Sequence, residues 1–291
     1  MKHRHGVVIP LYGSQPKELN KQLQSYLNAE IAIFLVQNNS AATENMDEEL
    51  KEMICREKAI TYIPNNNQGG VAGGFNRGIE RAFADNLEWI TLVDQDSRLS
   101  GHKLLRLREP WLTWPDLKLL VGPKILDGRR HEVHGRKRSQ TYGAYTRTRM
   151  LISSGTTFRA KDWPLLGPML EWLVVDFVDH AWSFHAGSKG FVLLQHPEVV
   201  LNQAFGERHP NPLCRLIGME LYSPTRHFYS IRNLRWLLTQ RQVPLDLKWK
   251  ELAKMSIKPW LWLLCEPRKI ENMKAILHAL LDPLGSSPEM D

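Results

Sequence analysis

Four short apolar runs divide the first part of the chain, and each one ends in polar or turn-forming residues. They cover residues 7–11, 31–36, 59–63 and 89–93. Segments with helical spacing or capping residues lie between them, after Ser14, over 45–55 and over 68–85. Strands that are apolar on both faces and alternate with helices are typical of a parallel sheet covered on both sides. The pattern therefore predicts an α/β fold.

The pattern is less regular in the second half of the chain. A basic, glycine-containing stretch at 128–149 predicts loops or a hairpin, and residues 152–158 predict a strand. A helix is expected over 178–189, followed by a short strand over 191–194. From about residue 226 the chain is helical in pattern, basic and rich in tryptophan.

The composition fits a folded protein of a reducing compartment. Hydrophobic residues make up 43% of the 291 residues, which is enough for a sizeable core. The three cysteines are widely spaced, so neither a disulfide framework nor a zinc site is predicted. No apolar run approaches the roughly 18 residues that span a bilayer, and the first residues do not form a signal peptide. We therefore expect a cytoplasmic protein.

The formal net charge of +7 admits several anionic partners. Nucleic acid, anionic lipid and phosphorylated small molecules all attract such a chain. No recognisable nucleic-acid module is present, and the aromatic residues are not interleaved with the basic stretch at 128–149, so nucleic acid is not expected as a partner. That stretch can engage phosphates, although a solvated loop is the commoner explanation.

Polar clusters follow all four predicted strands of the first part. They are Tyr12, Gln37–Asn39, Asn65–Asn67 and Asp94–Asp96. Because ligands bind at the carboxyl ends of parallel strands, we expect these clusters to share one site. Asp94 and Asp96 are carboxylates at i and i+2, and carboxylate and phosphate oxygens suit Mg²⁺ or Mn²⁺. A bare DxD triplet is often a solvated turn, but its place after a buried strand favours a metal and diphosphate site.

A glycine-rich segment, NQGGVAGGFNRG from Asn67 to Gly78, follows the third strand. Glycine permits close backbone approach, and a helix start offers N–H groups to an anion. A turn packed tightly on the sheet explains the glycines equally well, so both interpretations stay open. The segment is neither GxGxxG nor a P-loop, which disfavours Rossmann cofactors and Walker-type ATP binding.

Two carboxylates, Asp176 and Asp179, lie three residues apart near an expected helix start. Asp179 can act as a general base that removes a proton from an attacking hydroxyl. Capping of the helix also explains both acids, and from this segment alone it is the stronger interpretation. The histidines are scattered along the chain, and none is assigned to a metal.

Taken in order, these segments resemble the family 2 glycosyltransferases of the GT-A fold, in particular a bacterial rhamnosyltransferase-like branch. The resemblance covers about residues 6–235. It rests on the first strand with Tyr12, NNNQGGVAGGFNRGIERA from Asn65, WITLVDQDS from Trp89, ISSGTTF from Ile152, DFVDHAWSFHAGSKGF from Asp176 and FYSIRNLRWLL from Phe228. It implies a Rossmann-like, mostly parallel sheet flanked by helices. The catalytic domain would span 1–225, with a nucleotide-binding half at 1–100 and an acceptor half at 101–225, and a basic helical appendage would span 226–291.

The resemblance also implies inverting transfer of a sugar from a nucleoside-diphosphate donor, with a Mg²⁺ or Mn²⁺ ion. Asp96 would bind the metal, Asp94 would contact the nucleotide or the metal, and Asp179 matches the position of the catalytic base. dTDP-rhamnose is the favoured donor, UDP-sugars stay open, and the acceptor is a polysaccharide or lipid-linked glycan of the bacterial surface. The other donor-binding residues are Tyr12, Gln37 and Asn38 around the nucleobase, and Asn67, Gly70, Gly74 and Asn76 in the nucleotide-sugar pocket.

Three positions depart from the pattern of the family. Gln37 stands where an aspartate is usual, Ala181 where a second acid is frequent, and His185 where an arginine is common. Ala181 and His185 favour an alternative function, a non-catalytic subunit of the same fold that organises a membrane-associated glycan assembly. Retention of the three candidate carboxylates argues against it. A sugar-1-phosphate nucleotidyltransferase is disfavoured because its glycine- and arginine-rich loop is absent after the first strand.

Four tryptophans lie among basic residues in the C-terminal region: Trp236, Trp249, Trp260 and Trp262. Tryptophan suits a membrane interface, and lysine and arginine are drawn to anionic headgroups. Packing of the same tryptophans onto the catalytic domain is the competing explanation. Peripheral contact with the inner face of the cell membrane is therefore one of two open interpretations.

Overall fold

The computed structural model describes residues 4–13, 18–38, 46–127, 132–134, 141–203, 207–209, 214–215 and 220–284. The strands in these residues are β1 (His5–Leu11), β2 (Ala32–Gln37), β3 (Ile60–Pro64), β4 (Trp89–Leu92), β5 (Leu119–Asp127), β6 (Glu132–His134), β7 (Thr141–Tyr142), β8 (Tyr145–Thr148), β9 (Thr157–Arg159), β10 (Val192–Gln203), β11 (Glu207–Arg208) and β12 (Glu220–Leu221). Ten of them form one mixed sheet in the order β3-β2-β1-β4-β9-β5-β10-β8-β7, with β6 beside β5.

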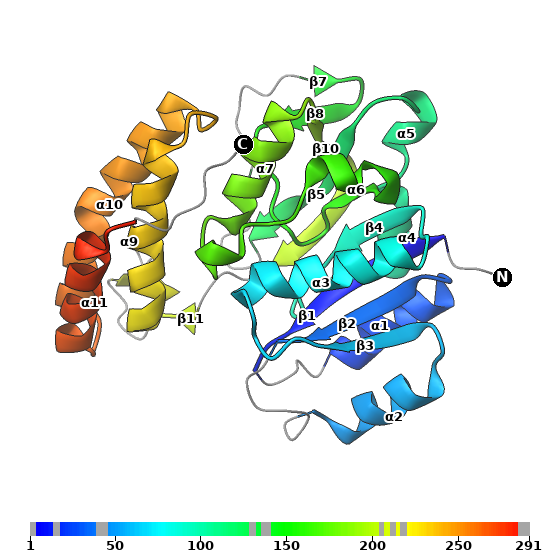
Figure 1. Ribbon diagram of the computed structural model, residues 1–291, viewed down its shortest axis with the longest axis horizontal. Helices are drawn as coiled ribbons and strands as arrows, with labels where there is room; N and C mark the ends of the chain where they lie inside the picture. The colour runs from blue at the N-terminus through cyan, green and yellow to red at the C-terminus, as the bar shows by residue number, and fades with distance from the viewer. Residues whose placement is uncertain are drawn as a thin grey trace.

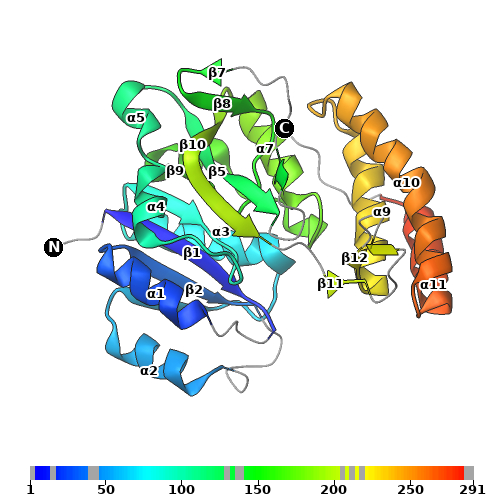
Figure 2. The ribbon, with the colours of Figure 1, turned by 180° about the vertical axis from the view of Figure 1, so that it is seen from behind.

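Helices cover both faces of this sheet, and three further helices lie beside it (Figure 1). The described helices are α1 (Leu19–Asn28), α2 (Glu48–Arg56), α3 (Gly70–Ala84), α4 (Gly101–Arg106), α5 (Pro110–Thr113), α6 (Trp163–Leu166), α7 (Val178–Ser188), α9 (Pro224–Thr239), α10 (Leu245–Cys265) and α11 (Lys269–Leu281), with short 3-10 helices at η2 (Ala160–Asp162) and η3 (Glu171–Leu173). α3 and α7 cover the face seen in Figure 1, and α1 and α4 cover the face seen in Figure 2. The separate group consists of α9, α10 and α11.

The α/β architecture predicted from the apolar runs is confirmed. β1 to β4 coincide with the four runs and pair in parallel, in the order β3-β2-β1-β4. Their side chains are buried on both faces because they divide between two hydrophobic cores. One core contains Val8, Phe34 and Ile90, and the other contains Val7 and Ile33. Neighbouring residues of one strand thus enter opposite cores, as the alternation of side chains along a strand requires.

The strand expected over residues 152–158 is wrong at its start, because β9 begins only at Thr157. The preceding residues form a turn against the end of β4. The N–H of Gly155, at φ +86°, donates to the Leu92 carbonyl at 2.7 Å, and the N–H of Thr156 donates to the Ser153 carbonyl at 2.8 Å. This turn places Ser153 and Ser154 beside the end of β4.

The strand expected over 191–194 is too short, because β10 continues to Gln203. Its pairing with β5 is irregular between Gln195 and Val200. His196 fills the irregularity, since its Nδ1 accepts from the N–H groups of Glu198 and Val199 at 3.1 Å each. The buried His196 side chain thus allows β10 to continue past the polar residues that follow Leu194. The predicted hairpin is confirmed only for β7 and β8, and much of 128–149 lies outside the described residues.

The C-terminal helices are joined to the main body through α9. Trp236 and Leu237 belong to the same core as Val8 and Phe34, whereas Ile231, Trp262 and neighbouring residues form a small core of their own. The domain boundary at residue 226 stays a prediction, but α9 packs as part of the main body. In the described parts of the chain, every helix is too short or too polar to cross a bilayer.

Candidate functional site

The carboxyl ends of β2 and β3 are joined by a buried network of amide side chains. Asn65 donates to Oδ1 of Asn38 at 2.6 Å, and Asn38 donates to the Gly70 carbonyl at 2.9 Å. Gln37 accepts the N–H of Asn66 through Oε1 at 3.1 Å. The network ties two strand ends to the first turn of α3. Gln37 and Asn38 therefore lie at the predicted edge of the sheet, with their side chains buried beneath its surface.

The glycines of α3 are explained by packing on the sheet. A Cβ at Gly74 would lie 2.9 Å from Cβ of Pro10, and a Cβ at Gly78 would lie 2.1 Å from the Val8 side chain. Gly70 has φ +60°, and its Cβ would lie 2.4 Å from the Val174 carbonyl oxygen. The N–H of Val71 donates to that same carbonyl at 3.1 Å. Fewer N–H groups are thus available to an anion here than the sequence pattern suggests.

Asn76 fastens the segment 169–171 to α3. Its amide nitrogen donates to the Met169 carbonyl at 2.9 Å and to Glu171 at 3.1 Å, and its oxygen accepts the N–H of Met169 at 2.8 Å. The residue is buried. Asn67 is half-buried, with φ +56°, in the turn before α3. The donor-binding roles of Asn67 and Asn76 stay predictions, and the position of Asn76 shows how it would shape a pocket wall.

Asp94, Gln95 and Asp96 follow β4 directly and lie beside the end of β1. The N–H of Tyr12 donates to Gln95 at 3.1 Å, and Gln95 donates back to the Tyr12 carbonyl at 2.5 Å. Gln95 therefore holds the two strand ends together, while Asp94 is half-buried and Asp96 is exposed. The Tyr12 side chain lies at the surface, with the residue 63% exposed.

The two carboxylates fit a site that a bound ligand completes. Within the described residues, no group of three or more histidine, cysteine or acidic side chains could hold a metal ion alone. Asp94 and Asp96 nevertheless offer hard oxygen donors at the ligand-binding edge of the sheet. Mg²⁺ is commonly held by one or two carboxylates together with substrate phosphates and water. The donor set therefore suits a metal that arrives with a diphosphate.

Two adjacent serines link this edge of the sheet to Asp179. The hydroxyl of Ser154 accepts the N–H of Asp94 at 3.1 Å and donates to the Ser97 hydroxyl at 2.6 Å. The hydroxyl of Ser153 donates to Oδ1 of Asp179 on α7. The turn before β9 thus brings the carboxylate pair and the candidate base into one site, although they are more than 80 residues apart in the sequence.

Asp179 has the electrostatic environment of a base. It retains some solvent-accessible surface, although protein atoms surround its carboxyl group densely. Burial raises its pKa, the hydrogen bonds from Ser153 oppose that rise, and the Asp176 carboxylate adds to it. Asp176 itself pairs with Arg226 at 3.0 Å and accepts from the Ser230 hydroxyl. Of the two acids, Asp176 is therefore engaged by α9, whereas Asp179 adjoins the serine turn.

The residues that follow Asp179 on α7 are largely packed into the protein. Trp182 is buried in the core, and its indole N–H donates to the Gly167 carbonyl at 3.1 Å. Ala181 is buried as well. Burial lowers the pKa of His180 to about 4, so this imidazole is neutral at pH 7. His185 follows on the same helix, and its Nε2 lies 3.6 Å from where a Cβ of Gly167 would be.

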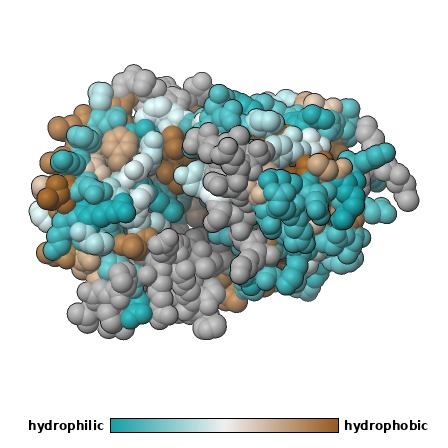
Figure 3. All heavy atoms as spheres, turned by 90° about the horizontal axis from the view of Figure 1, so that it is seen from below, coloured by the Kyte–Doolittle hydropathy of each residue, from teal (hydrophilic) through white to brown (hydrophobic). Residues whose placement is uncertain are grey.

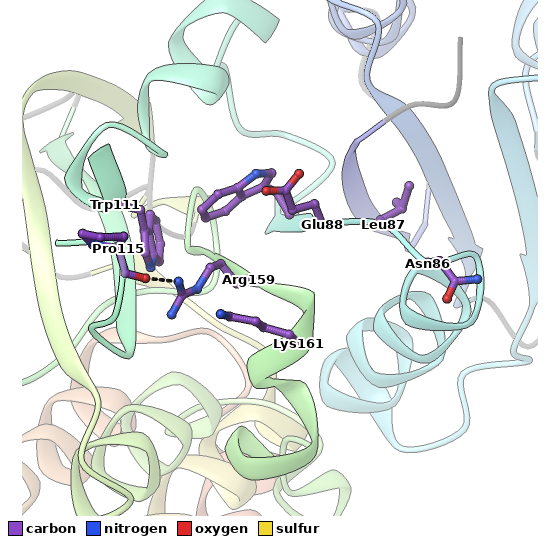
Figure 4. A pocket seen from close by; sticks show the side chains of 8 residues that line it. Asn86, Leu87, Glu88, Trp111, Pro115, Arg159 and Lys161 are labelled. Atoms are coloured by element: carbon purple, nitrogen blue, oxygen red, sulfur yellow. Dashed lines mark hydrogen bonds between the residues drawn. The ribbon is translucent and has the colours of Figure 1, made fainter. Parts of the chain in front are cut away.

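A surface cavity of about 520 Å³ lies away from this site. Its lining includes Glu88 and Trp89 at the amino end of β4, together with Trp111, Arg159 and Lys161 (Figure 4). Arg159 is occupied, because it pairs with Asp162 and donates to the carbonyls of Pro115 and Leu117. In parallel sheets ligands bind at the carboxyl ends of the strands, so we place the functional site at the opposite edge.

Some members of the site were not identified as such from the sequence. Ser153 and Ser154 lie in the ISSGTTF segment, where the expected strand concealed their role as a turn. Gln95 and Asn65 belong to the polar clusters expected at the site, but the sequence does not reveal that each bonds to a neighbouring strand end. An amide side chain directly after a predicted parallel strand is a sequence signal for a residue that can bond to a neighbouring strand end.

Comparisons with known proteins bear on the family and the fold. The family model for glycosyl transferase family 2 matches residues 6–167. The dTDP-rhamnosyl transferase RfbF of Shigella flexneri is 26% identical over 290 residues, which cover 94% of this chain and 93% of RfbF. Among solved structures, S. aureus TarS superposes with a TM-score of 0.59 at 16% identity, over 98% of this chain and 49% of TarS.

Two further structures carry ligands. S. aureus TarS 1-349 in complex with UDP has a TM-score of 0.54 at 14% identity, over 96% of this chain and 81% of that one. GalNAc-T7 with UDP, GalNAc and Mn²⁺ has a TM-score of 0.57 at 15% identity, over 90% of this chain and 56% of that one. At these low identities the superpositions show a shared GT-A fold and nothing further, and this chain spans about half the length of TarS. Because the family model covers more than half of the chain, the protein belongs to glycosyl transferase family 2.

Proposed function

We propose that this glycosyltransferase transfers rhamnose, with inversion, from dTDP-rhamnose to a hydroxyl of a polysaccharide or lipid-linked glycan in bacterial surface glycan synthesis. The observation that carries the proposal is the serine turn, in which Ser154 binds the backbone of Asp94 and Ser153 binds Asp179. A displacement at an anomeric carbon needs a held leaving group on one side and a base on the other. Similarity to a dTDP-rhamnosyl transferase supports the donor, and a UDP-sugar is the alternative.

The donor nucleotide is proposed to lie at the carboxyl ends of β1 to β4. Tyr12 offers an exposed ring to the nucleobase, and Gln37 and Asn38 form the floor beneath it through their amide network. The wall is the first turns of α3, where Gly70 lies close to the backbone of Val174 and Gly74 lies close to the side chains of Pro10 and Asn38. The remaining donor-binding residues in this proposal are Asn67, Asn76 and Asp94.

Asp94 and Asp96 are proposed to hold Mg²⁺ or Mn²⁺ together with oxygens of the diphosphate. When bound, the ion neutralises negative charge on the departing nucleoside diphosphate. GalNAc-T7, which shares the fold, was solved with Mn²⁺. The half-buried position of Asp94 and the exposure of Asp96 give the pair one side anchored in the protein and one side open to a ligand.

Asp179 is proposed as the catalytic base. The acceptor oxygen bonds to the anomeric carbon as the bond from that carbon to the diphosphate oxygen breaks, and the hydroxyl proton passes to Asp179. A raised pKa makes a carboxylate a stronger base while it remains ionised at the working pH. Burial supplies that rise, and the Ser153 hydroxyl fixes Oδ1.

Contact with an anionic membrane surface is proposed for α10. Trp249 and Trp260 are 69% and 67% exposed, whereas Trp236 and Trp262 are buried and serve packing instead. The exposed apolar side chains on α10 follow a helical spacing that gathers most of them on one stripe: Leu245, Trp249, Leu252, Ile257, Trp260 and Leu264. Figure 3 shows apolar residues gathered at this end of the molecule. Such a stripe among lysines suits the headgroup region, where a lipid-linked acceptor would be reached.

The membrane proposal is tested by flotation with liposomes that contain phosphatidylglycerol, at low and high salt. The protein should float at low salt, and a Trp249→Ala, Trp260→Ala double variant should float at least several-fold less. Trp262→Ala is the control for a buried tryptophan, to be used only if it folds. A wild-type protein that ignores these liposomes at low salt contradicts the proposal.

The donor is tested by thermal stabilisation with a panel of dTDP- and UDP-sugars, with and without Mn²⁺. A ligand at one hundred times its Kd stabilises the native state by about 2.7 kcal/mol. We expect dTDP-rhamnose with Mn²⁺ to raise Tm most, and Asp96→Ala to remove the Mn²⁺-dependent part while leaving the unliganded Tm unchanged. A protein that no nucleotide sugar stabilises would support the non-catalytic alternative.

A further inference from the structure

The side chain of Asn233 on α9 holds the backbone that leads into α7. It is fully buried, and its amide nitrogen lies 2.8 Å from the carbonyl oxygen of Leu173, 2.6 Å from that of Val175 and 3.0 Å from that of Asp176. Its oxygen accepts from the Arg232 guanidinium at 2.9 and 3.0 Å. One side chain thus lies within hydrogen-bond distance of three carbonyl groups of a four-residue segment that is more than 50 positions earlier in the sequence.

The neighbouring residue continues the same attachment. Arg232 donates to the Trp172 carbonyl at 2.6 Å, and its guanidinium lies 4.0 Å from the centre of the Trp172 ring. Its own burial lowers the pKa of this arginine. Two consecutive residues of α9 therefore bind the segment from 172 to 176.

The backbone of this segment adopts unusual dihedral angles just before α7. Val174, Asp176 and Phe177 have φ values of 62°, 52° and 63°. Side chains other than glycine are strained there, at roughly 1–3 kcal/mol each, and such residues persist only where surrounding contacts impose them. Phe177 is the last of them and precedes the first residue of α7, which carries Asp179. The direction in which α7 begins therefore depends on the contacts made by α9.

α9 also determines the charge beside the base. Arg226 donates to Asp176 at 3.0 and 3.2 Å, and the Ser230 hydroxyl donates to the other carboxylate oxygen. Asp176 is the charged group whose field raises the pKa of Asp179. The adjacent His180 is neutral at pH 7, because burial lowers its pKa to about 4, and Glu251, Lys250 and Lys254 of α10 act on that imidazole.

We propose that α9 positions the base: Asn233 and Arg232 fix the backbone before α7, and Arg226 binds Asp176 so that Asp179 is the carboxylate left to accept the acceptor's proton. The inference rests on the proposed role of Asp179. It makes the C-terminal region a working part of the catalytic site, where the sequence suggested an appendage. Asn233 and Arg226 are positioning residues in this arrangement, since they act through the segment they hold.

The charge part is tested without substrate, by carbon NMR of aspartate carboxyl groups, with the Asp179→Asn spectrum identifying the Asp179 signal. Arg226→Met leaves the Asp176 charge uncompensated, so the pKa of Asp179 should move upward, by roughly half a pH unit or more. Adding Asp176→Asn to Arg226→Met removes the uncompensated charge, so the pKa of Asp179 should move back toward its wild-type value. A purely structural role for Arg226 predicts no such return.

The matched control is Arg235→Met. Arg235 lies on the same helix but donates to the carbonyls of Ala279 and Asp282, away from Asp179. It should destabilise the helical group and leave the Asp179 titration unchanged. An Asp179 pKa that does not respond to Arg226→Met, or that responds equally to Arg235→Met, overturns the inference.

The positioning part is tested by release of dTDP from dTDP-rhamnose in the presence of acceptor, below the unfolding temperature of each variant. Asn233→Ala should lower kcat by at least tenfold while the KM for dTDP-rhamnose changes by less than threefold. Arg235→Met should leave kcat within about twofold. Equal kcat in Asn233→Ala and wild type overturns the inference, provided that Asp179→Asn is inactive. If Asp179→Asn is active, the proposed base is wrong and the inference falls with it.

Discussion

The proposed donor edge of the sheet, at the carboxyl ends of β1 to β4, and the segment that carries Asp179 are built in opposite ways. At the donor edge, Asn38 and Asn65 join strand ends whose positions the parallel register already determines. The segment that carries Asp179, residues 169–179, contains no strand. Asn76 of α3 binds it at the Met169 carbonyl, and Asn233 of α9 binds it at the Leu173 carbonyl. The strand ends are therefore positioned mainly by the sheet, whereas the segment that carries Asp179 is positioned largely by side chains of α3 and α9.

This difference predicts that nucleotide binding and the chemical step respond to substitutions in different parts of the protein. Changes at the strand ends should act on nucleotide affinity, since they leave α7 in place. Changes in the segment 172–179 or in α9 should act on the chemical step, since they leave β1 to β4 in place. Gly70 is an exception, because it lies in contact with both regions.

The largest effect is expected at Asp179. Asp179→Asn should lower the rate of rhamnose transfer by about 10²–10⁴-fold, the usual contribution of a general base, because an amide cannot take the acceptor's proton. Calorimetric binding of dTDP with Mn²⁺ should be unchanged, because the strand ends are untouched. Asp176→Asn should be milder, since that carboxylate is engaged by Arg226. Near wild-type transfer by Asp179→Asn would falsify the assignment of the base.

The next effect is expected at Gly70, where the two regions meet. Gly70→Ala places a Cβ 2.4 Å from the Val174 carbonyl oxygen at a φ of +60°, and neither backbone can give way easily. We expect a loss of about 2–5 kcal/mol in the free energy of unfolding, from strain and overpacking together. Urea denaturation measures the loss, and it should be accompanied by weaker dTDP binding and slower transfer.

The control for Gly70 lies on α7. Gly187 is helical, and a Cβ there meets nothing within 4 Å. Gly187→Ala should therefore stabilise the protein by about 0.5–1 kcal/mol through the reduced entropy of the unfolded chain. If both glycine variants lose stability to the same extent, the contact with Val174 does not explain the effect at Gly70.

The same contrast explains what the sequence can predict. The strands at 7–11 and 89–93 are evident because burial on both faces leaves an uninterrupted apolar run, and the end of such a run locates Asp94 and Asp96. The sequence predicts a strand at Ser153, where the structure has a turn. That turn depends on hydrogen bonds from Gly155 to the Leu92 carbonyl and from Asp94 to the Ser154 hydroxyl, which local sequence does not reveal. Asn233 lies in an expected helix, but its three carbonyl partners belong to a segment with positive φ that no periodicity reveals.

The smallest effect is expected in the free energy of unfolding of Asp179→Asn, the substitution that removes the proposed base. Burial raises the pKa of Asp179, so the native protein binds a proton there over a pH range in which the unfolded chain, with a pKa of about 3.9, has lost it. Stability contributed by this group is therefore present at low pH and declines as the pH rises through that range, because ionisation is less favourable in the fold.

Asp179→Asn removes that decline while keeping an oxygen that can accept from Ser153. At pH 7 the variant should exceed the wild type in free energy of unfolding, as is common when a functional group held in an unfavourable environment is replaced. The difference should shrink as the pH falls through and below about 3.9, where the unfolded wild type takes up the same proton. Urea denaturation from about pH 3 to pH 8 gives the comparison, and every other titrating group is common to both proteins and cancels. A variant that is less stable than wild type at pH 7 would mean that Asp179 stabilises the fold as an ionised cap, the role its place at the start of α7 first suggested.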